Sequence, residues 1–170
     1  MAAVLRPLLD ALDDARGVRA TGVAAMKVLE AAEKVAWEGI RFSALRMGKI
    51  AAGAAVAGCW EPEGRALIDR MEAVGVNAGD VSSWTAVLLP LSRLGCADEC
   101  LEVLDIMEAA VGLDGMAGRH TFSQGSTGDR RDELITVAHN HCMFAFIKAA
   151  RHVEAVEHFD TYFRRPQPSD

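Results

Sequence analysis

The four cysteines are the side chains best suited to metal binding or redox chemistry, and their spacing favours neither. No C-x-x-C pair occurs among Cys59, Cys96, Cys100 and Cys142. Cys96 and Cys100 share one face of a helix, but residues that pack into a helical core have the same spacing. Zinc sites and disulfide frameworks follow other patterns. We therefore expect buried free thiols in a reducing compartment.

The histidines and the glycine-rich segment 115–129 provide no catalytic pattern either. His139 and His141 are two residues apart and lie on different faces of a helix, and Cys142 adds no metal-ligand spacing. His152 and His158 stand six apart on the last helix, where we expect both to be exposed. The glycines of 115–129 lack the Lys-Ser/Thr of a phosphate-binding loop and the nucleophile-elbow pattern. The chain is therefore predicted to be no enzyme, with no metal and no cofactor.

The elements that position these side chains are all expected to be helices. Apolar residues make up 51% of the 170 residues, Ala and Leu are abundant, and β-branched and aromatic residues are sparse. Periodicity predicts helices over 4–15, 21–35, 43–57, 61–74, 80–94, 98–111, 132–150 and 152–163. No apolar run reaches the ~18 residues that a membrane-spanning helix needs. We therefore expect an all-α protein without a membrane partner.

Short polar side chains and glycines should mark the helix ends. The expected N-caps are Ser43 for the third helix and Asp80, Ser82 or Ser83 for the fifth, and the expected stops are Gly58 and Gly95. Pro62 suits the first turn of the fourth helix, where its missing N–H has no intrahelical partner, and Pro90 should kink the fifth.

A fixed period underlies these helices. Val35, Met71 and Met107 stand 36 residues apart, and Gly39, Gly75 and Gly112 follow them by four, four and five residues. A period in the thirties is typical of a helical-hairpin solenoid, in which each unit buries its apolar face only against its neighbours. This period, and no catalytic motif, is the main indication of function.

One unit carries enough pattern to compare with a family. VSSWTAVLLPLSRLGCADECLEVLDIMEAAVGLD, residues 81–114, resembles a pentatricopeptide repeat, with an aromatic near the start, a glycine at the turn and a small residue in the second helix. TVAHNHCMFAFIKAARHVEAVEHFDTYFRRPQPSD, residues 136–170, resembles a second copy, and AGCWEPEGRALIDRMEAVGV belongs to a degraded third. Ala150 replaces the turn glycine in the second copy.

The resemblance implies an α-solenoid of about four antiparallel helical hairpins in a right-handed superhelix. Residues 1–43 would form a degraded N-terminal helical pair, 44–114 two repeats, 115–130 a flexible insertion, and 131–170 a C-terminal repeat.

The resemblance also implies that single-stranded RNA lies along the first helices of the pairs, with about one base per repeat. The base-reading pairs would be Thr85 with Asp114 (or Gly115), Asn140 with Asp170, and Gly48 with Asp80, although Gly48 has no side chain to offer. Ser82, Val137 and Leu45 would sandwich the bases. Hydroxyl, amide and carboxylate groups suit the hydrogen-bonding edges of bases. The alternative is that Thr85 and Asn140 only cap helices or face solvent.

The charge pattern bears on this expectation, because the net charge of −6 has the wrong sign for a nucleic-acid binder. The first-helix segments 41–57, 81–94 and 133–150 carry a net charge of +4, whereas the second-helix segments 61–74, 96–111 and 151–165 carry −7. The presumed groove is therefore mildly basic. Arg93 and Lys148, with Arg46 and Lys49, are expected to contact phosphate. Ordinary solvated helix faces are the alternative.

A scaffold that binds other proteins is the competing function. It would be a peripheral subunit of an organellar ribosome or another complex, or further repeats would stack on its open ends. Its candidate contact residues are Trp37, Trp60 and Phe163. A mitochondrial or plastid location follows from the resemblance alone. The first residues do not resemble a targeting peptide, so we expect either that the chain lacks one or that it is an internal piece of a longer protein.

Overall fold

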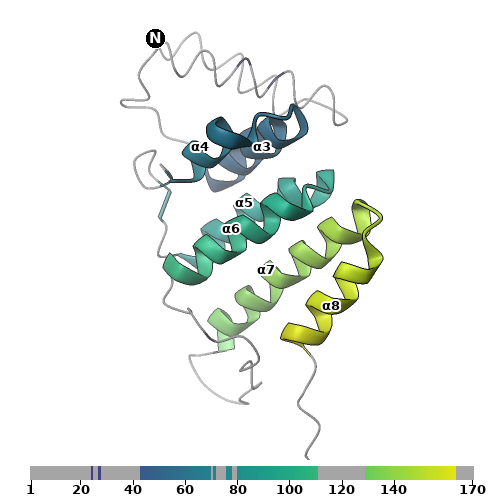
Figure 1. The fold of residues 1–170 in the computed structure, drawn as a ribbon. Helices are drawn as coiled ribbons and strands as arrows, with labels where there is room; N and C mark the ends of the chain where they lie inside the picture. Colours follow the sequence, from purple (N-terminus) through teal and green to yellow (C-terminus); the bar gives the residue numbers. More distant parts are fainter. Residues whose placement is uncertain are drawn as a thin grey trace, which may run out of the picture.

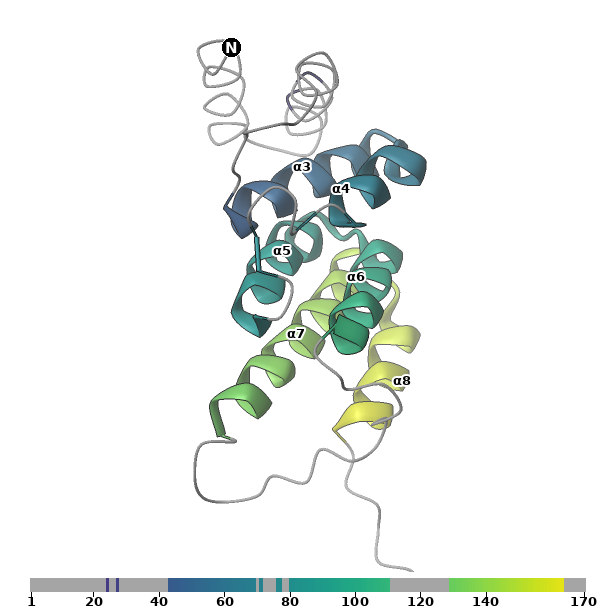
Figure 2. The same cartoon turned by 90° about the vertical axis from the view of Figure 1, so that its left-hand side faces the viewer.

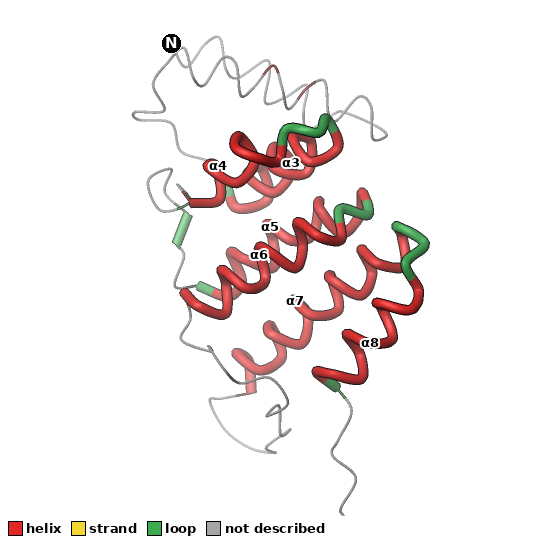
Figure 3. The backbone as a smooth tube through the Cα atoms, viewed as in Figure 1, coloured by secondary structure: helices red, strands yellow, loops and turns green. Residues whose placement is uncertain are grey.

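The computed structural model describes Ala24, Lys27, residues 43–69, Met71, 76–77, 80–110 and 129–163. Within these ranges the chain is all-α, as predicted, and contains no strand (Figure 3). The elements are α3 (Ala44–Val56), the π-helical turn η1 (Trp60–Gly64), α4 (Arg65–Asp69), α5 (Val81–Leu94), α6 (Ala97–Ala110), α7 (Asp129–Lys148) and α8 (His152–Tyr162). The predicted helix over 4–15, most of that over 21–35 and most of the insertion lie outside the described residues.

The helices are arranged as successive antiparallel pairs (Figure 1). Helix α3 pairs with η1 and α4, α5 with α6, and α7 with α8. The first helices also touch in order, α3 against α5 and α5 against α7, while α6 contacts both α5 and α7. Viewed from the side, α3, α5 and α7 follow one another through the molecule (Figure 2). We call these the first-helix layer, and α4, α6 and α8 the second-helix layer.

The N-caps form as the sequence predicts. Ser43 accepts a hydrogen bond from the Arg46 amide at 3.3 Å and starts α3. Asp80 starts α5 by accepting from the Ser82 amide at 3.2 Å. The hydroxyls of Ser82 and Ser83 donate to the same Asp80 carboxylate, so that these two serines support the cap and do not replace it.

All three first helices end with the same turn. A left-handed residue follows each helix, namely Gly58 (φ 74°), Gly95 (φ 76°) and Ala150 (φ 59°). The next amide then bonds back over five residues, from Cys59 to the Ala54 carbonyl at 2.8 Å, Cys96 to Leu91 at 3.1 Å, and Arg151 to Phe146 at 2.9 Å. This is the Schellman arrangement. It gives the three pairs a common register, in which residues at equal distances from the turn are equivalent.

The predicted fourth helix, 61–74, is wrong at its start. Glu61 has an extended backbone (φ −101°, ψ 123°), because the ring of a following proline excludes the helical region for the residue before it. The chain makes a π-helical turn instead, and regular helix begins at Arg65. Residues 72–75, in the second half of the prediction, lie outside the described part.

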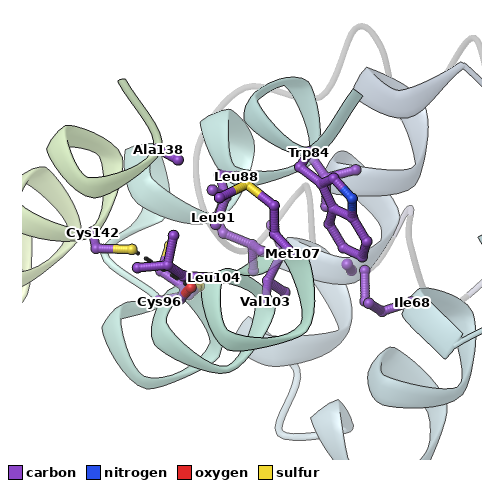
Figure 4. Packing of buried hydrophobic residues seen from close by; sticks show 14 of the residues in the cluster. Ile68, Trp84, Leu88, Leu91, Cys96, Val103, Leu104, Met107, Ala138 and Cys142 are labelled. Atoms are coloured by element: carbon purple, nitrogen blue, oxygen red, sulfur yellow. Dashed lines mark hydrogen bonds between the residues drawn. The ribbon is translucent and has the colours of Figure 1, made fainter. Parts of the chain in front are cut away.

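One continuous core joins the pairs (Figure 4). Trp84, Leu88 and Leu91 of α5 lie buried at its centre, between residues of α3 and α4 on one side and α7 on the other. The predicted burial of the thiols is confirmed for Cys96, Cys100 and Cys142, and Cys59 is half-buried. The Cys142 thiol donates to the Cys100 carbonyl at 3.5 Å and so ties α7 to α6.

No helix in the described ranges is long and apolar enough to cross a membrane.

Candidate functional site

The common register puts the three expected base-reading positions in equivalent places. Gly48, Thr85 and Asn140 each stand ten residues before the left-handed residue of their pair, on helices that touch in order. Leu45, Ser82 and Val137 are likewise equivalent, three residues earlier. The structure therefore supports the alignment behind these predictions. The environments of the three positions nevertheless differ.

Gly48 has to be removed from the candidates, because it is buried where α3 packs on α5. A Cβ atom at this position would stand 2.4 Å from the Val87 carbonyl oxygen and 3.0 Å from the Pro90 ring. No base can approach a residue that is covered by another helix backbone. The absence of a side chain serves helix packing here, since only glycine permits this contact.

Thr85 and Asn140 remain, and Asn140 is the more accessible. Thr85 is half-buried and its hydroxyl donates to the Ser82 carbonyl at 2.9 Å. Asn140 is exposed on α7, so that its amide can meet a ligand from solvent. Of the sandwiching positions, Ser82 and Leu45 are exposed and Val137 is half-buried.

The carboxylates expected to assist base reading have other roles or lie elsewhere. Asp80 caps α5, and hydrogen bonds from Ser82, and secondarily from Ser83, lower the pKa of its carboxyl. Asp114 and Asp170 lie outside the described residues. The Asp80 carboxylate, which was expected to act with Gly48, therefore serves as a helix cap.

The expected phosphate-contacting cations lie on the first-helix layer. Arg93 and Lys148 are equivalent, two residues before the left-handed turn residue, and both are exposed. Lys148 Nζ lies 5.3 Å from the centre of the Phe144 ring, a cation–π distance. Arg46 and Lys49 on α3 are less exposed than these two cations, since both are half-buried.

The two layers differ in charge, because acidic residues concentrate in α6 and α8. Helices α3 and α5 contain basic residues and no acidic ones, and α7 contains three of each kind. In the other layer α6 contains five acidic residues and α8 three, with no Lys or Arg in either. Arg93 places a positive charge where α5 meets α7. Burial first, and then the charge of Arg93, lowers the pKa of His141 on α7.

A buried histidine pair, which sequence reasoning missed, joins α6, α7 and α8. His139 is fully buried, and its Nδ1 lies 3.2 Å from Nε2 of His158. Its Nε2 lies 3.3 Å from the Glu108 carboxylate. The Tyr162 ring is tilted against the His139 ring, with ring centres 4.1 Å apart. His158 is 8% exposed, so the expectation that it faces solvent is wrong. Burial, and secondarily the charge of His139, lowers the pKa of His158 to about 4.

The common register could have predicted the burial of one member of this pair, His139. His139 is equivalent to Met47 and Trp84, which are both buried. It therefore occupies the place of the aromatic residue that begins the preceding repeat. For His158 the sequence holds no such signal. No group of three side chains suited to a metal ion exists among the described residues, this pair included.

Glu102 of α6 joins the first described pair to the second. Its carboxylate accepts from Trp60 Nε1 at 2.6 Å and from the Arg65 guanidinium. Trp60, a candidate partner contact, is therefore engaged within the molecule. Phe163, another candidate, stacks on Phe159 with ring centres 5.5 Å apart, and Trp37 lies outside the described residues. At the other junction, Arg151 donates to Asp98 at 2.6 Å.

Comparison with known proteins identified no relative of this chain. No protein-family model matches the chain, and no curated protein or solved structure matches it significantly.

Proposed function

We propose that the helical pairs form an α-solenoid of the pentatricopeptide-repeat kind, with a right-handed superhelix, and that it binds single-stranded RNA without catalysing a reaction. The observation that supports this proposal is the difference in charge between α3 and α5, which have no acidic residues, and α6 and α8, which have no Lys or Arg. A polyanion is attracted to the first-helix layer and repelled by the acidic helices α6 and α8. The biological role would be RNA processing, stability or translation in a mitochondrion or plastid.

The RNA contacts are proposed to be mostly electrostatic. Arg93 and Lys148 would bind phosphates at equivalent places on adjacent helices, with Arg46 and Lys49 extending the track onto α3. Asn140 would read a base, and Thr85 would do so less well because its hydroxyl already donates to a carbonyl. So few contacts predict weak and salt-sensitive binding.

The first test measures fluorescence-anisotropy binding to a random single-stranded RNA pool at low and moderate salt. We expect the Arg93→Gln/Lys148→Gln variant to lose about tenfold or more in affinity and to show a shallower salt dependence, by about one to two in slope. The matched control is Ala66→Glu/Ala109→Glu, which makes the same net charge change at exposed positions of α4 and α6. Equal weakening by both variants, or no binding at low salt, would contradict the proposal.

Base reading is tested in the same assay after selection of a preferred sequence. Asn140→Ala combined with Thr85→Ala should relax the sequence preference while the helical content, measured by circular dichroism, stays unchanged. An unaltered preference would refute the base-reading roles and leave only phosphate binding.

A protein-binding scaffold, such as a peripheral subunit of an organellar ribosome or another complex, is the second candidate. Two of the base-reading positions are closed to RNA, since Gly48 is buried and the Asp80 carboxylate caps a helix. Absence of RNA binding in the anisotropy assay, together with recovery of a defined complex from organelle extract, would favour this candidate.

A further inference from the structure

Phe144 of α7 is an aromatic ring that the fold leaves in contact with solvent. It is 41% exposed, whereas Trp84 of α5 and Phe146 of α7, the other Phe and Trp residues of α3, α5 and α7, are 1% and 3% exposed. In the other pairs the equivalent residues, six places before the left-handed turn residue, are Leu89, which is half-buried, and Ala52, which is fully buried. Packing of the helical pairs therefore does not require an aromatic residue at this place.

Phe144 lies between the two residues of α7 that the proposed RNA track already uses. Asn140 precedes it by four residues and Lys148 follows it by four, and residues at this spacing are neighbours on one side of a helix. A helix rises about 1.5 Å per residue, so each of these steps covers about 6 Å along the axis. All three side chains are exposed. They form a row that offers an amide, a flat ring and a cation in order.

Positive charge lies beside the ring. Lys148 Nζ is 5.3 Å from its centre. A second cation, Arg93 of α5, stands near the same part of α7, where burial, and then the charge of this cation, lowers the pKa of His141. A nucleotide carries a flat base and an anionic phosphate close together. A solvent-exposed ring with cations beside it suits both parts of a nucleotide.

Phe159 of α8, the other exposed phenylalanine of the described residues, has different surroundings. It is 49% exposed, and its ring stacks on Phe163 with ring centres 5.5 Å apart. Helix α8 contains three acidic residues and no Lys or Arg. A polyanion is repelled from such a helix, so Phe159 provides a matched control of the same residue type and similar exposure.

We propose that Phe144 is a base-stacking residue, on whose ring one base of the bound RNA stacks. Lys148 and Arg93 hold the phosphates beside this base, while Asn140 reads an adjacent base. This role rests on the RNA binding proposed above. Stacking uses the face of a base, which every base has, so Phe144 adds affinity without selecting a sequence. It also releases no counterions, so this part of the affinity should not depend on salt.

The experiment is the anisotropy assay at low and moderate salt with two short labelled strands, one of RNA and one of ribose and phosphate without bases. Phe144→Ala should weaken RNA binding about fivefold or more, with an unchanged salt slope, and should leave binding to the base-free strand unaltered. Phe144→Trp, which keeps a flat ring, should bind RNA at least as tightly as the unaltered chain. Phe159→Ala should bind both strands like the unaltered chain.

The stacking role and the RNA track can fail separately. If Phe144→Ala binds RNA normally while Arg93→Gln/Lys148→Gln does not, the stacking role is overturned and phosphate binding stands. Equal weakening of Phe144→Ala on both strands would also overturn it, because the ring would then act only by positioning Lys148. Absence of RNA binding by the unaltered chain would overturn the stacking role together with the proposed function. If circular dichroism shows that the alanine variant is unfolded, Phe144→Leu replaces it with the same expectation, since leucine has no flat ring.

Discussion

His158 is buried, which was not expected for a histidine on the last helix. It lies between His139 of α7 and Tyr162 of its own helix, with the Phe146 ring 6.2 Å from its own. Glu108 of α6 faces the pair and Asp105 lies near it, and burial, followed by Glu108, raises the pKa of Asp105. Burial, and then these two carboxylates, also raises the pKa of Tyr162. These shifts favour the neutral forms of His158, Asp105 and Tyr162.

The histidine pair therefore predicts a loss of stability on acidification. Since the pKa of His158 falls from 6.5 to about 4 on folding, the unfolded chain binds more protons between these values. Stability is complete above about pH 6.5 and decreases as the pH falls toward 4, by at most roughly 3 kcal/mol from this group. Urea unfolding at several pH values measures the decrease.

The control for this prediction is the other histidine of the helix. His158→Gln cannot titrate, so its unfolding free energy should change less between pH 7 and pH 4.5, whereas His152→Gln, at an exposed position, should keep the full decrease. If both variants respond to pH like the unaltered chain, the pair is not the origin of the acid sensitivity.

Among the helical elements, the turn between α7 and α8 carries a conformational cost that the other two turns avoid. Ala150 is the one non-glycine residue with positive φ in the described ranges, in the place that Gly58 and Gly95 take in the other pairs. A Cβ atom makes this backbone conformation unfavourable by roughly 1–2 kcal/mol. The alanine reduces the entropy of the unfolded chain, which offsets part of this cost.

Ala150→Gly is therefore predicted to stabilise the protein by about 0.5–1 kcal/mol, raising the melting temperature by about 1–4 °C. Calorimetry on the two chains measures the difference. Ala149→Gly serves as control, because the backbone at Ala149 is not left-handed and a glycine there should destabilise instead. A fall in melting temperature for both variants would show that the turn does not strain Ala150.

The elements differ in how far the sequence predicts them. Ser43, Asp80 and Gly95 are predictable as helix ends, because a cap needs only the residues within one turn of it. The predicted start of α4 is wrong, although the rule for residues before proline already disfavours helix at Glu61. Burial of His158 could not be predicted, since α8 offers both an apolar stripe and a face containing Ala155 and His158. The choice of the face that packs inward depends on the helices that neighbour α8 in space.

The same reason limits prediction of the candidate site. The pentatricopeptide-repeat resemblance places Gly48, Thr85 and Asn140 at equivalent positions, and the turns at Gly58, Gly95 and Ala150 give them the same register in the structure. It could not show that Gly48 lies under α5 or that the Thr85 hydroxyl is engaged, because both depend on neighbouring backbone. Asn140 stays a candidate because α7 leaves it exposed.

Across the whole molecule, stability should decline from the middle pair toward the last helix. Helix α5 packs against α3, α6 and α7, whereas the main contacts of α8 are with α7 alone among the described elements. Native-state hydrogen exchange should therefore be slowest in α5. The amides of α8 should exchange through a local opening that is insensitive to low denaturant. Equal protection of α5 and α8 would instead indicate one cooperative unit.

The difference in charge between the layers also gives the described helices an electric dipole moment. Near any strong polyanion the protein experiences a torque that turns its acidic helices away, so the orientation of approach is selected before contact. At physiological salt this torque acts only within about 8 Å, the screening length. Two anionic strands are therefore not expected to bind opposite sides of the molecule, because the acidic helices repel the second strand.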